Sequence, residues 1–322
     1  MYGFVNDLQL MPRTYGLAWH KFKIVGGKDS KITISKIKVR PWLPGDREVL
    51  SKLAGKHKSI DTTATQFHAP TNEDYQKYLK SLEGAADRYA AKERFLTPFE
   101  ILMQPVPAGR FQRPEDERKV FISKDFHCSA HEITQQQFFD IMGYNPASIQ
   151  GNPYLPVDSV TMDEAIDFCN RLNKRLDADS RVPEGYRYRL PTEAEWTWAA
   201  MADGKSNMDV PESECWHWDT SEGSYRMVGT STPSKRGLYD MHGNVEELTN
   251  NKYHRRKSPK DEAESEELVD PVSKPKSTDH VVVKGGSWNV SVEWLQASWR
   301  ARRNPGRTPG RGFRVVLAPA HE

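Results

Sequence analysis

Residues 188–200 of the chain read YRLPTEAEWTWAA. Within this stretch, Thr192 stands before an apolar run and Glu195 follows three positions later. A threonine oxygen at such a place accepts an orphan N–H of the first helical turn, and the acidic side chain reaches back to the threonine N–H. The stretch therefore predicts a helix that begins after Thr192 and carries Trp196 and Ala199.

Two further helix starts have the same pattern. Thr134 is followed by Gln137, and Thr161 is followed by Glu164. Each such cap stabilises its helix by about 1 kcal/mol. Two helices are expected, with apolar faces formed by Phe138, Ile141 and Met142 and by Ala165, Phe168, Cys169 and Leu172.

Four blocks of sequence follow one another in a defined order. They are PVPAG at 105–109 with SAHEITQQQFFDIM at 129–142, PVDSVTMDEAIDFCNRL at 156–172 with the stretch at 188–200, GLYDMHGNVEELTN at 237–250, and VVKGGSW at 282–288 with GFRVVL at 312–317. Together they resemble the formylglycine-generating enzyme family, also called the sulfatase-modifying factor family. The resemblance implies a C-type-lectin-like α+β domain with little regular structure and a small twisted antiparallel sheet.

The rest of the chain is organised around that domain. Residues 1–95 form an accessory N-terminal region of unassigned fold, with a strand-like stretch at 31–40 and a helical stretch at 73–94. The domain itself runs from 96 to 322. Residues 252–279 are charged and punctuated by proline, so they predict a surface loop or a disordered insert.

Composition places few limits on function. The chain has 322 residues, with 46 basic and 44 acidic side chains and a net charge of +2, which does not demand a nucleic-acid or membrane partner. Neither an apolar run of the roughly 20 residues needed to span a bilayer nor a signal peptide is visible. We expect a cytoplasmic protein, or one assembled into a virion or other particle. Three cysteines without a C-x-x-C pair are expected to be reduced structural thiols.

The residues that formylglycine chemistry needs are missing. In formylglycine-generating enzymes, two cysteines after the G-G-S-W/Y motif bind copper(I), a soft metal that prefers thiolates. The matching positions here hold Val290 and Leu295, and no cysteine follows Cys215. We therefore expect neither copper nor formylglycine-generating activity.

Two other metals follow from the resemblance. A structural calcium would use the carboxylates of Asp240 and Glu247 and the carbonyls of Gly243 and Val245, since calcium prefers hard oxygen ligands. The alternative is that both carboxylates only bind N–H groups of their own loop. Related iron-dependent enzymes carry an H-x-x-x-H-x-E helix motif, and residues 127–132 fall one residue short of it. The N-terminal region offers His20, His57 and His68 at no recognisable ligand spacing, so iron is not expected.

Several glycines and tryptophans are expected to shape the scaffold. Gly285 and Gly286 permit unusual dihedral angles, and Gly243 allows a tight turn. Short elements need large apolar side chains to fill a core. Four tryptophans are expected to do so, namely Trp196, Trp198, Trp288 and Trp299.

Function in such a fold is expected on exposed loops, because these vary on a stable scaffold. We predict a binding module that recognises a protein or other macromolecule through residues 289–311, the place of the variable stretch in variable proteins and phage adhesins of this fold. The surface residues are Asn289, Ser291, Glu293, Trp294, Gln296, Arg302, Arg303, Arg307 and Arg311. A divergent oxidoreductase, either an iron-dependent oxygenase or an oxidase, is the alternative. Nucleic-acid binding through the arginine-rich stretch at 299–311 is the third hypothesis.

Overall fold

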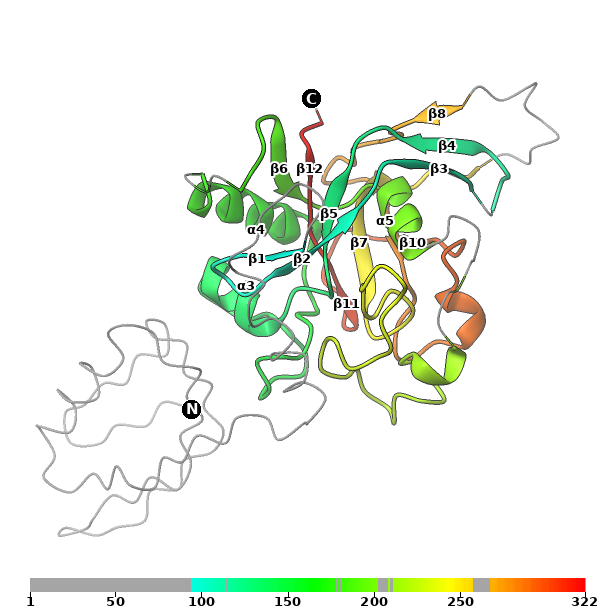
Figure 1. Ribbon diagram of the computed structural model, residues 1–322. Coiled ribbons are helices and arrows are strands. Elements are labelled where there is room, and N and C mark those ends of the chain that lie inside the picture. Colours follow the sequence, from blue (N-terminus) through cyan, green and yellow to red (C-terminus); the bar gives the residue numbers. More distant parts are fainter. Residues whose placement is uncertain are drawn as a thin grey trace, which may run out of the picture. The chain divides into compact units, whose positions relative to one another are not determined.

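The computed structural model describes residues 94–113, 115–177, 179, 181–201, 208, 211–256 and 267–321 (Figure 1). These residues belong to one compact unit that spans Asn72–Glu322. The strand expected at 31–40, and all but the last residue of the helix expected at 73–94, lie outside the described residues.

A five-stranded sheet forms one half of the domain, in the order β1-β2-β5-β12-β6. Its strands are β1 Phe95–Leu96, β2 Leu102–Val106, β5 Phe126–Ser129, β12 Val316–Pro319 and β6 Tyr186–Arg189. All neighbours in it are antiparallel. The last strand of the chain, β12, lies between β5 and β6, and Val316 is paired with Cys128 on one side and Arg189 on the other. The end of the chain thereby completes the sheet that its first strands begin.

A four-stranded sheet forms the other half of the domain. Its order is β10-β9-β7-β11, and β11 runs parallel to β7. Its strands are β10 Ala301–Arg303, β9 Val281–Lys284, β7 Glu246–Lys252 and β11 Arg311–Gly312. The third block of sequence therefore ends in β7, and the fourth begins in β9, its antiparallel neighbour.

A third, smaller sheet changes one expectation from the sequence. It contains β3 Gly109–Gln112, β4 Lys119–Ile122 and β8 Leu268–Val269. Strand β8 lies inside the stretch at 252–279, which we expected to be a loop or insert throughout. That expectation is wrong for these residues, because Leu268 packs on the hydrophobic core beside β4 and its partner Val120 is fully buried.

The three α-helices of the described residues are α3 Gln135–Met142, α4 Met162–Arg175 and α5 Glu193–Ala200. All three capping boxes are present, so the predicted helix starts are confirmed. Two short 3₁₀ helices follow, η2 Glu212–Glu214 and η4 Val292–Leu295. No helix in the described part of the chain is both long and apolar enough to cross a membrane.

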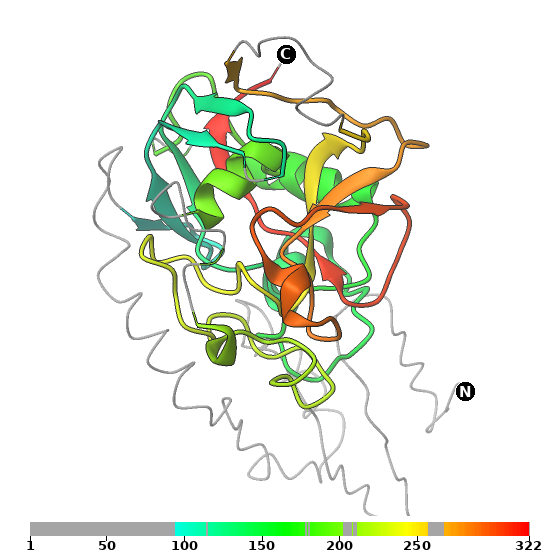
Figure 2. The same ribbon diagram turned by 90° about the vertical axis from the view of Figure 1, so that its right-hand side faces the viewer.

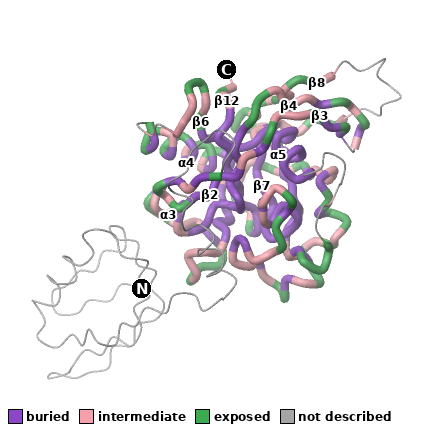
Figure 3. Tube along the Cα trace, viewed as in Figure 1, coloured by how far each residue is buried: buried purple, intermediate pink, exposed green. Residues whose placement is uncertain are grey.

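The core explains why so little regular structure suffices. Every residue of α5 is buried, and Trp196 is fully enclosed. The rings of Phe138 on α3 and Phe168 on α4 stack at 5.7 Å, and Phe313 meets Phe168 edge-on at 5.2 Å. Figure 3 shows buried chain running through the strands and α5, with exposed residues gathered on the connecting loops. The α+β fold predicted from the sequence is confirmed.

Candidate functional site

Two glycines bring the third and fourth blocks of sequence together. Gly243 has a φ of +109°, and its N–H donates to the carbonyl of Gly285 at 2.8 Å. A Cβ atom at Gly243 would lie 2.2 Å from the carbonyl oxygen of Trp216. Gly285 and Gly286 also have positive φ values, of +84° and +68°. These positions therefore need glycine, as the sequence predicted, because other residues are strained or too large there.

A buried ion pair lies beneath these loops. Arg314 and Glu247 are both fully buried, and the guanidinium donates two hydrogen bonds of 2.6 Å to the carboxylate. The indole N–H of Trp196 donates a third bond to Glu247, at 2.7 Å. Burial alone would lower the pKa of Arg314, but Glu247 raises it above its usual value. Both oxygens of Glu247 are therefore committed to the scaffold.

Two more carboxyls lie in the same region. Glu132 accepts a hydrogen bond from the side chain of Asn244 at 3.0 Å, and Asp240 accepts one from the N–H of Gly229 at 2.7 Å. Among the described residues, no donor reaches the other oxygen of either carboxyl. Burial raises the pKa of both groups, and the charge of Asp240 raises that of Glu132 further. Close buried carboxyls favour holding one proton between them.

The predicted calcium ligands are only partly suited to an ion. Calcium takes about 6–8 oxygen ligands. As the side chains are arranged, Glu247 does not fit, because Arg314 and Trp196 take its oxygens and Arg314 adds a positive charge. Asp240 keeps one oxygen that accepts no hydrogen bond in the described structure. Calcium binding stays a prediction.

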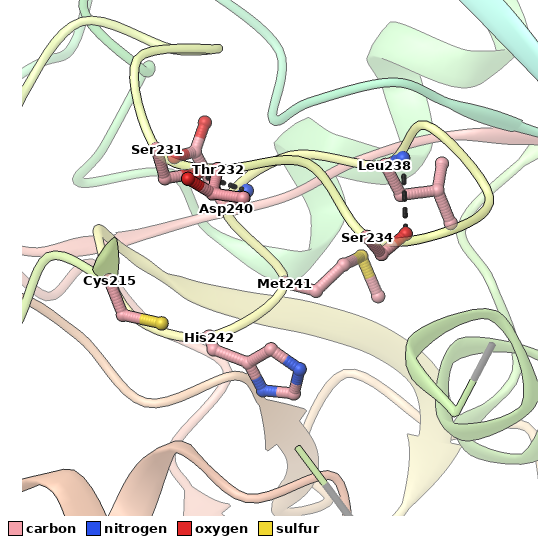
Figure 4. Close-up of a pocket in the computed structure, with 8 residues that line it drawn as sticks. All are labelled: Cys215, Ser231, Thr232, Ser234, Leu238, Asp240, Met241 and His242. Carbon is pink, nitrogen blue, oxygen red and sulfur yellow. Dashed lines mark hydrogen bonds between the residues drawn. The ribbon is translucent and has the colours of Figure 1, made fainter. Parts of the chain in front are cut away.

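A small pocket opens beside Asp240 (Figure 4). Its lining includes Cys215, His242 and Asp240, and its volume is about 10 Å³. A volume of that size holds about one water molecule. The pocket is therefore too small to enclose an organic substrate.

The positions expected to lack copper ligands are well defined. Leu295 is buried in η4, and the carbonyl of Val290 accepts the backbone N–H of Trp218 at 3.0 Å. All three cysteines are buried, as expected for structural thiols. Across the described ranges, no group of three or more His, Cys, Asp or Glu side chains has a metal-binding arrangement.

The histidines considered for iron are divided between structural surroundings. His127 lies on β5 with its ring edge-on to Phe95, at 5.0 Å. The ring of His131 is buried, and its Nδ1 lies 2.7 Å from the carbonyl oxygen of Glu132. Burial lowers the pKa of His131 to about 4. The remaining candidates, His20, His57 and His68, lie outside the described residues.

Most of the predicted surface arginines serve the scaffold instead. Arg303 pairs with Glu246 at 2.5 Å, and Arg307 pairs with Glu164. Arg311 is fully buried, so it is not part of the surface on which the sequence placed it. Its guanidinium donates to backbone carbonyls of its own loop, including that of Asn304 at 2.8 Å. Of the four arginines predicted for this surface, Arg302 is the one that is exposed and has no ion pair in the described structure.

The remaining predicted surface residues lie together around η4. They are exposed, namely Asn289, Ser291, Glu293, Trp294 and Gln296. The ring of Trp294 stacks on that of Trp299 at 4.8 Å with an interplanar angle of 29°. The prediction that Trp196 and Trp198 anchor the core is confirmed. It is wrong for Trp299, which is only partly buried because it supports the exposed ring of Trp294.

Trp218 is a surface residue that the sequence did not reveal. Trp218 is 67% exposed, and its backbone N–H donates a hydrogen bond to the carbonyl of Val290. Residues 216–218 read Trp-His-Trp, and the sequence does not indicate which of the two tryptophan rings faces solvent. The pattern that could have marked this loop is its acidic composition, since residues 211–225 contain no lysine or arginine.

Comparison with known proteins agrees with this architecture. Residues 82–319 match the family model of the sulfatase-modifying factor enzyme 1-like domain. Among curated proteins, the chain is similar to a chaperone protein, LppX, of Paenibacillus barcinonensis. The two are 27% identical over 243 residues, an alignment that covers 60% of this chain and 80% of that protein.

Solved structures share the fold at low sequence identity. Variable protein 1 of Treponema denticola is 22% identical, with a TM-score of 0.59, and the match covers 68% of this chain and 95% of that one. PvdO from Pseudomonas aeruginosa is 21% identical, also with a TM-score of 0.59, over 72% of this chain and 100% of that one. At such identities these likenesses establish the fold only.

Proposed function

We propose that this chain, which belongs to the sulfatase-modifying factor enzyme 1-like family, is a non-catalytic binding module. It recognises a macromolecular partner through the loop surface at 289–311. The observation that carries this proposal is the exposed indole of Trp294, 41% exposed and stacked on Trp299. A large ring held rigidly at a loop tip buries much apolar surface in a complex at little cost in conformational entropy.

The absence of the family's redox ligands supports the same reading. Val290 and Leu295 stand where formylglycine-generating enzymes have cysteines, and neither side chain ligates a metal. The pocket beside Asp240 has room for about one water molecule. The curated relative is named a chaperone, a name that speaks of contact with other proteins.

Nucleic-acid binding is less well supported. Phosphate recognition needs guanidinium groups that are available to a ligand. Here Arg303 and Arg307 pair with scaffold carboxylates, and Arg311 is buried against backbone carbonyls. A steep loss of binding with rising salt would be required to revive that hypothesis.

Site-specific photo-crosslinking tests the proposal. The photoreactive residue p-benzoylphenylalanine is placed at position 294 of the full chain, and irradiation in native extract is expected to give a discrete adduct. The matched control places the same residue at Val269 on β8, an apolar side chain that is 57% exposed away from η4. Adducts of equal yield from both positions, or from neither, would contradict a binding surface at 289–311.

A further inference from the structure

Two loops that each carry an exposed tryptophan are hydrogen-bonded to each other. The backbone N–H of Trp218 donates to Val290 at 3.0 Å, and the hydroxyl of Ser221 donates to the carbonyl of Trp288 at 2.9 Å. Figure 2 shows the orange turn of η4 beside the yellow-green loops that follow η2. We call residues 211–225 and 287–299 together the tryptophan face.

The charge of the tryptophan face is one-sided. Its two segments contain no lysine and no arginine. They contain five exposed carboxylates, namely Glu212, Glu214, Asp219, Glu222 and Glu293. The side chains of Asp219 and Glu222 are 76% and 83% exposed. A chain with a net charge of +2 therefore carries a local acidic surface around its exposed indoles.

The contacts of these carboxylates leave most of their negative charges unneutralised. A hydrogen bond from Ser291 lowers the pKa of Glu293, so this exposed group is a carboxylate at neutral pH. Asp219 lies 3.8 Å from Nδ1 of the buried His217. Glu222 is the member that has a cationic partner, since Arg226 pairs with it at 2.6 Å. The tryptophan face therefore carries both exposed indoles and exposed carboxylates.

We infer that the partner of the tryptophan face is a basic protein segment, whose arginine or lysine side chains lie over the indoles and between the carboxylates. This inference rests on the proposed binding function and names the chemistry of its partner. An arginine is suited to both parts of the surface, because its planar guanidinium stacks on indole faces and its N–H groups bind carboxylates.

The same surface disfavours other partners. Nucleic acids and acidic peptides would bring phosphates or carboxylates against five exposed carboxylates, and like charges repel. A neutral partner, such as an uncharged oligosaccharide, would use the indoles but gain nothing from the carboxylates. The contribution of Glu293 and Asp219 therefore separates a basic partner from a neutral one.

Fluorescence anisotropy with defined peptides tests the inference. The probe is a labelled peptide of repeated Gly-Arg-Ser units, and its control has citrulline, the uncharged analogue, in place of arginine. We expect the arginine peptide to bind the full chain about tenfold more tightly than the citrulline peptide, and W294A and E293Q each to weaken it about threefold to fivefold. The matched controls on α4, I166A and D163N, remove an apolar and an acidic exposed side chain elsewhere and are expected to change nothing.

The outcomes separate the inference from the proposed function. Equal binding of both peptides, or arginine-peptide binding that W294A and E293Q leave unchanged, overturns the basic partner. A neutral oligosaccharide whose binding falls in W294A but not in E293Q also overturns it, while leaving the binding module in place. Failure of every probe together with failure of the crosslink from position 294 overturns both.

Discussion

Removing Arg314 is expected to be among the most damaging single changes in the domain. R314M takes away both hydrogen bonds to Glu247, each 2.6 Å long, and the bonds to the carbonyls of Ser129 and Tyr239 at 3.1 and 2.9 Å. A buried carboxylate that loses its partner costs about 3–5 kcal/mol. Two carbonyls without a donor add about 1 kcal/mol each. The sum approaches the whole stability of a typical domain, about 5–15 kcal/mol.

Urea unfolding followed by far-UV circular dichroism measures this loss. E247Q and the double variant R314M/E247Q complete a thermodynamic cycle. In the double variant no unpaired charge remains buried, so it is expected to be more stable than R314M alone by about 2 kcal/mol. If R314M does not fold, R314K, which keeps the charge but loses the planar fork, gives an intermediate value. A loss below about 1 kcal/mol in R314M, or additive losses in the double variant, would refute the reasoning.

Three further changes test other parts of the site. G243A is expected to lower the free energy of unfolding by well above the roughly 1–3 kcal/mol of a strained φ, because its Cβ would meet the backbone of Trp216. The control is G223A, which also has a positive φ but lies in open space, so its urea melt measures the backbone strain alone. Burial lowers the pKa of His131 to about 4 in the folded chain, so lowering the pH from 6.5 to 4 protonates it more completely in the unfolded chain than in the folded one. About 3 kcal/mol of unfolding free energy is therefore lost over this range, and H131Q is expected to flatten the slope. A bound calcium predicts a lower Tm in EDTA than in calcium chloride, a difference that D240N removes; equal melting of the native chain in both would contradict calcium binding.

Local patterns predicted the helix starts well because their physics is local. Each capping box needs only a threonine and a residue three positions later, as with Thr161 and Glu164. The positive φ of Gly243 was also predictable, because a tight turn selects glycine whatever surrounds it. The same holds for the missing cysteines, since the identity of a residue is enough to exclude thiolate chemistry.

Pairings between distant residues were not predictable. Arg314 and Glu247 are 67 positions apart, and nothing in either neighbourhood shows that they meet in the core. Leu268 pairs with Val120 across an even longer separation, so the charged composition around Leu268 gave no indication of a strand. The direction of a tryptophan ring depends on such pairings too. Trp299 was expected in the core and instead supports an exposed neighbour.

The arginine-rich end of the chain shows how such pairings decide what a partner meets. Arg300 binds Glu193 on α5 at 2.6 Å, and Arg303 binds Glu246 on β7 at 2.5 Å. These contacts fasten a long connection to a scaffold that has few strands with which to hold it. Arginines that are paired with carboxylates of their own chain no longer attract phosphate, while the carboxylates of the tryptophan face stay exposed to solvent. The charge that the tryptophan face presents to solvent is therefore the charge left exposed after internal pairing, and it is negative.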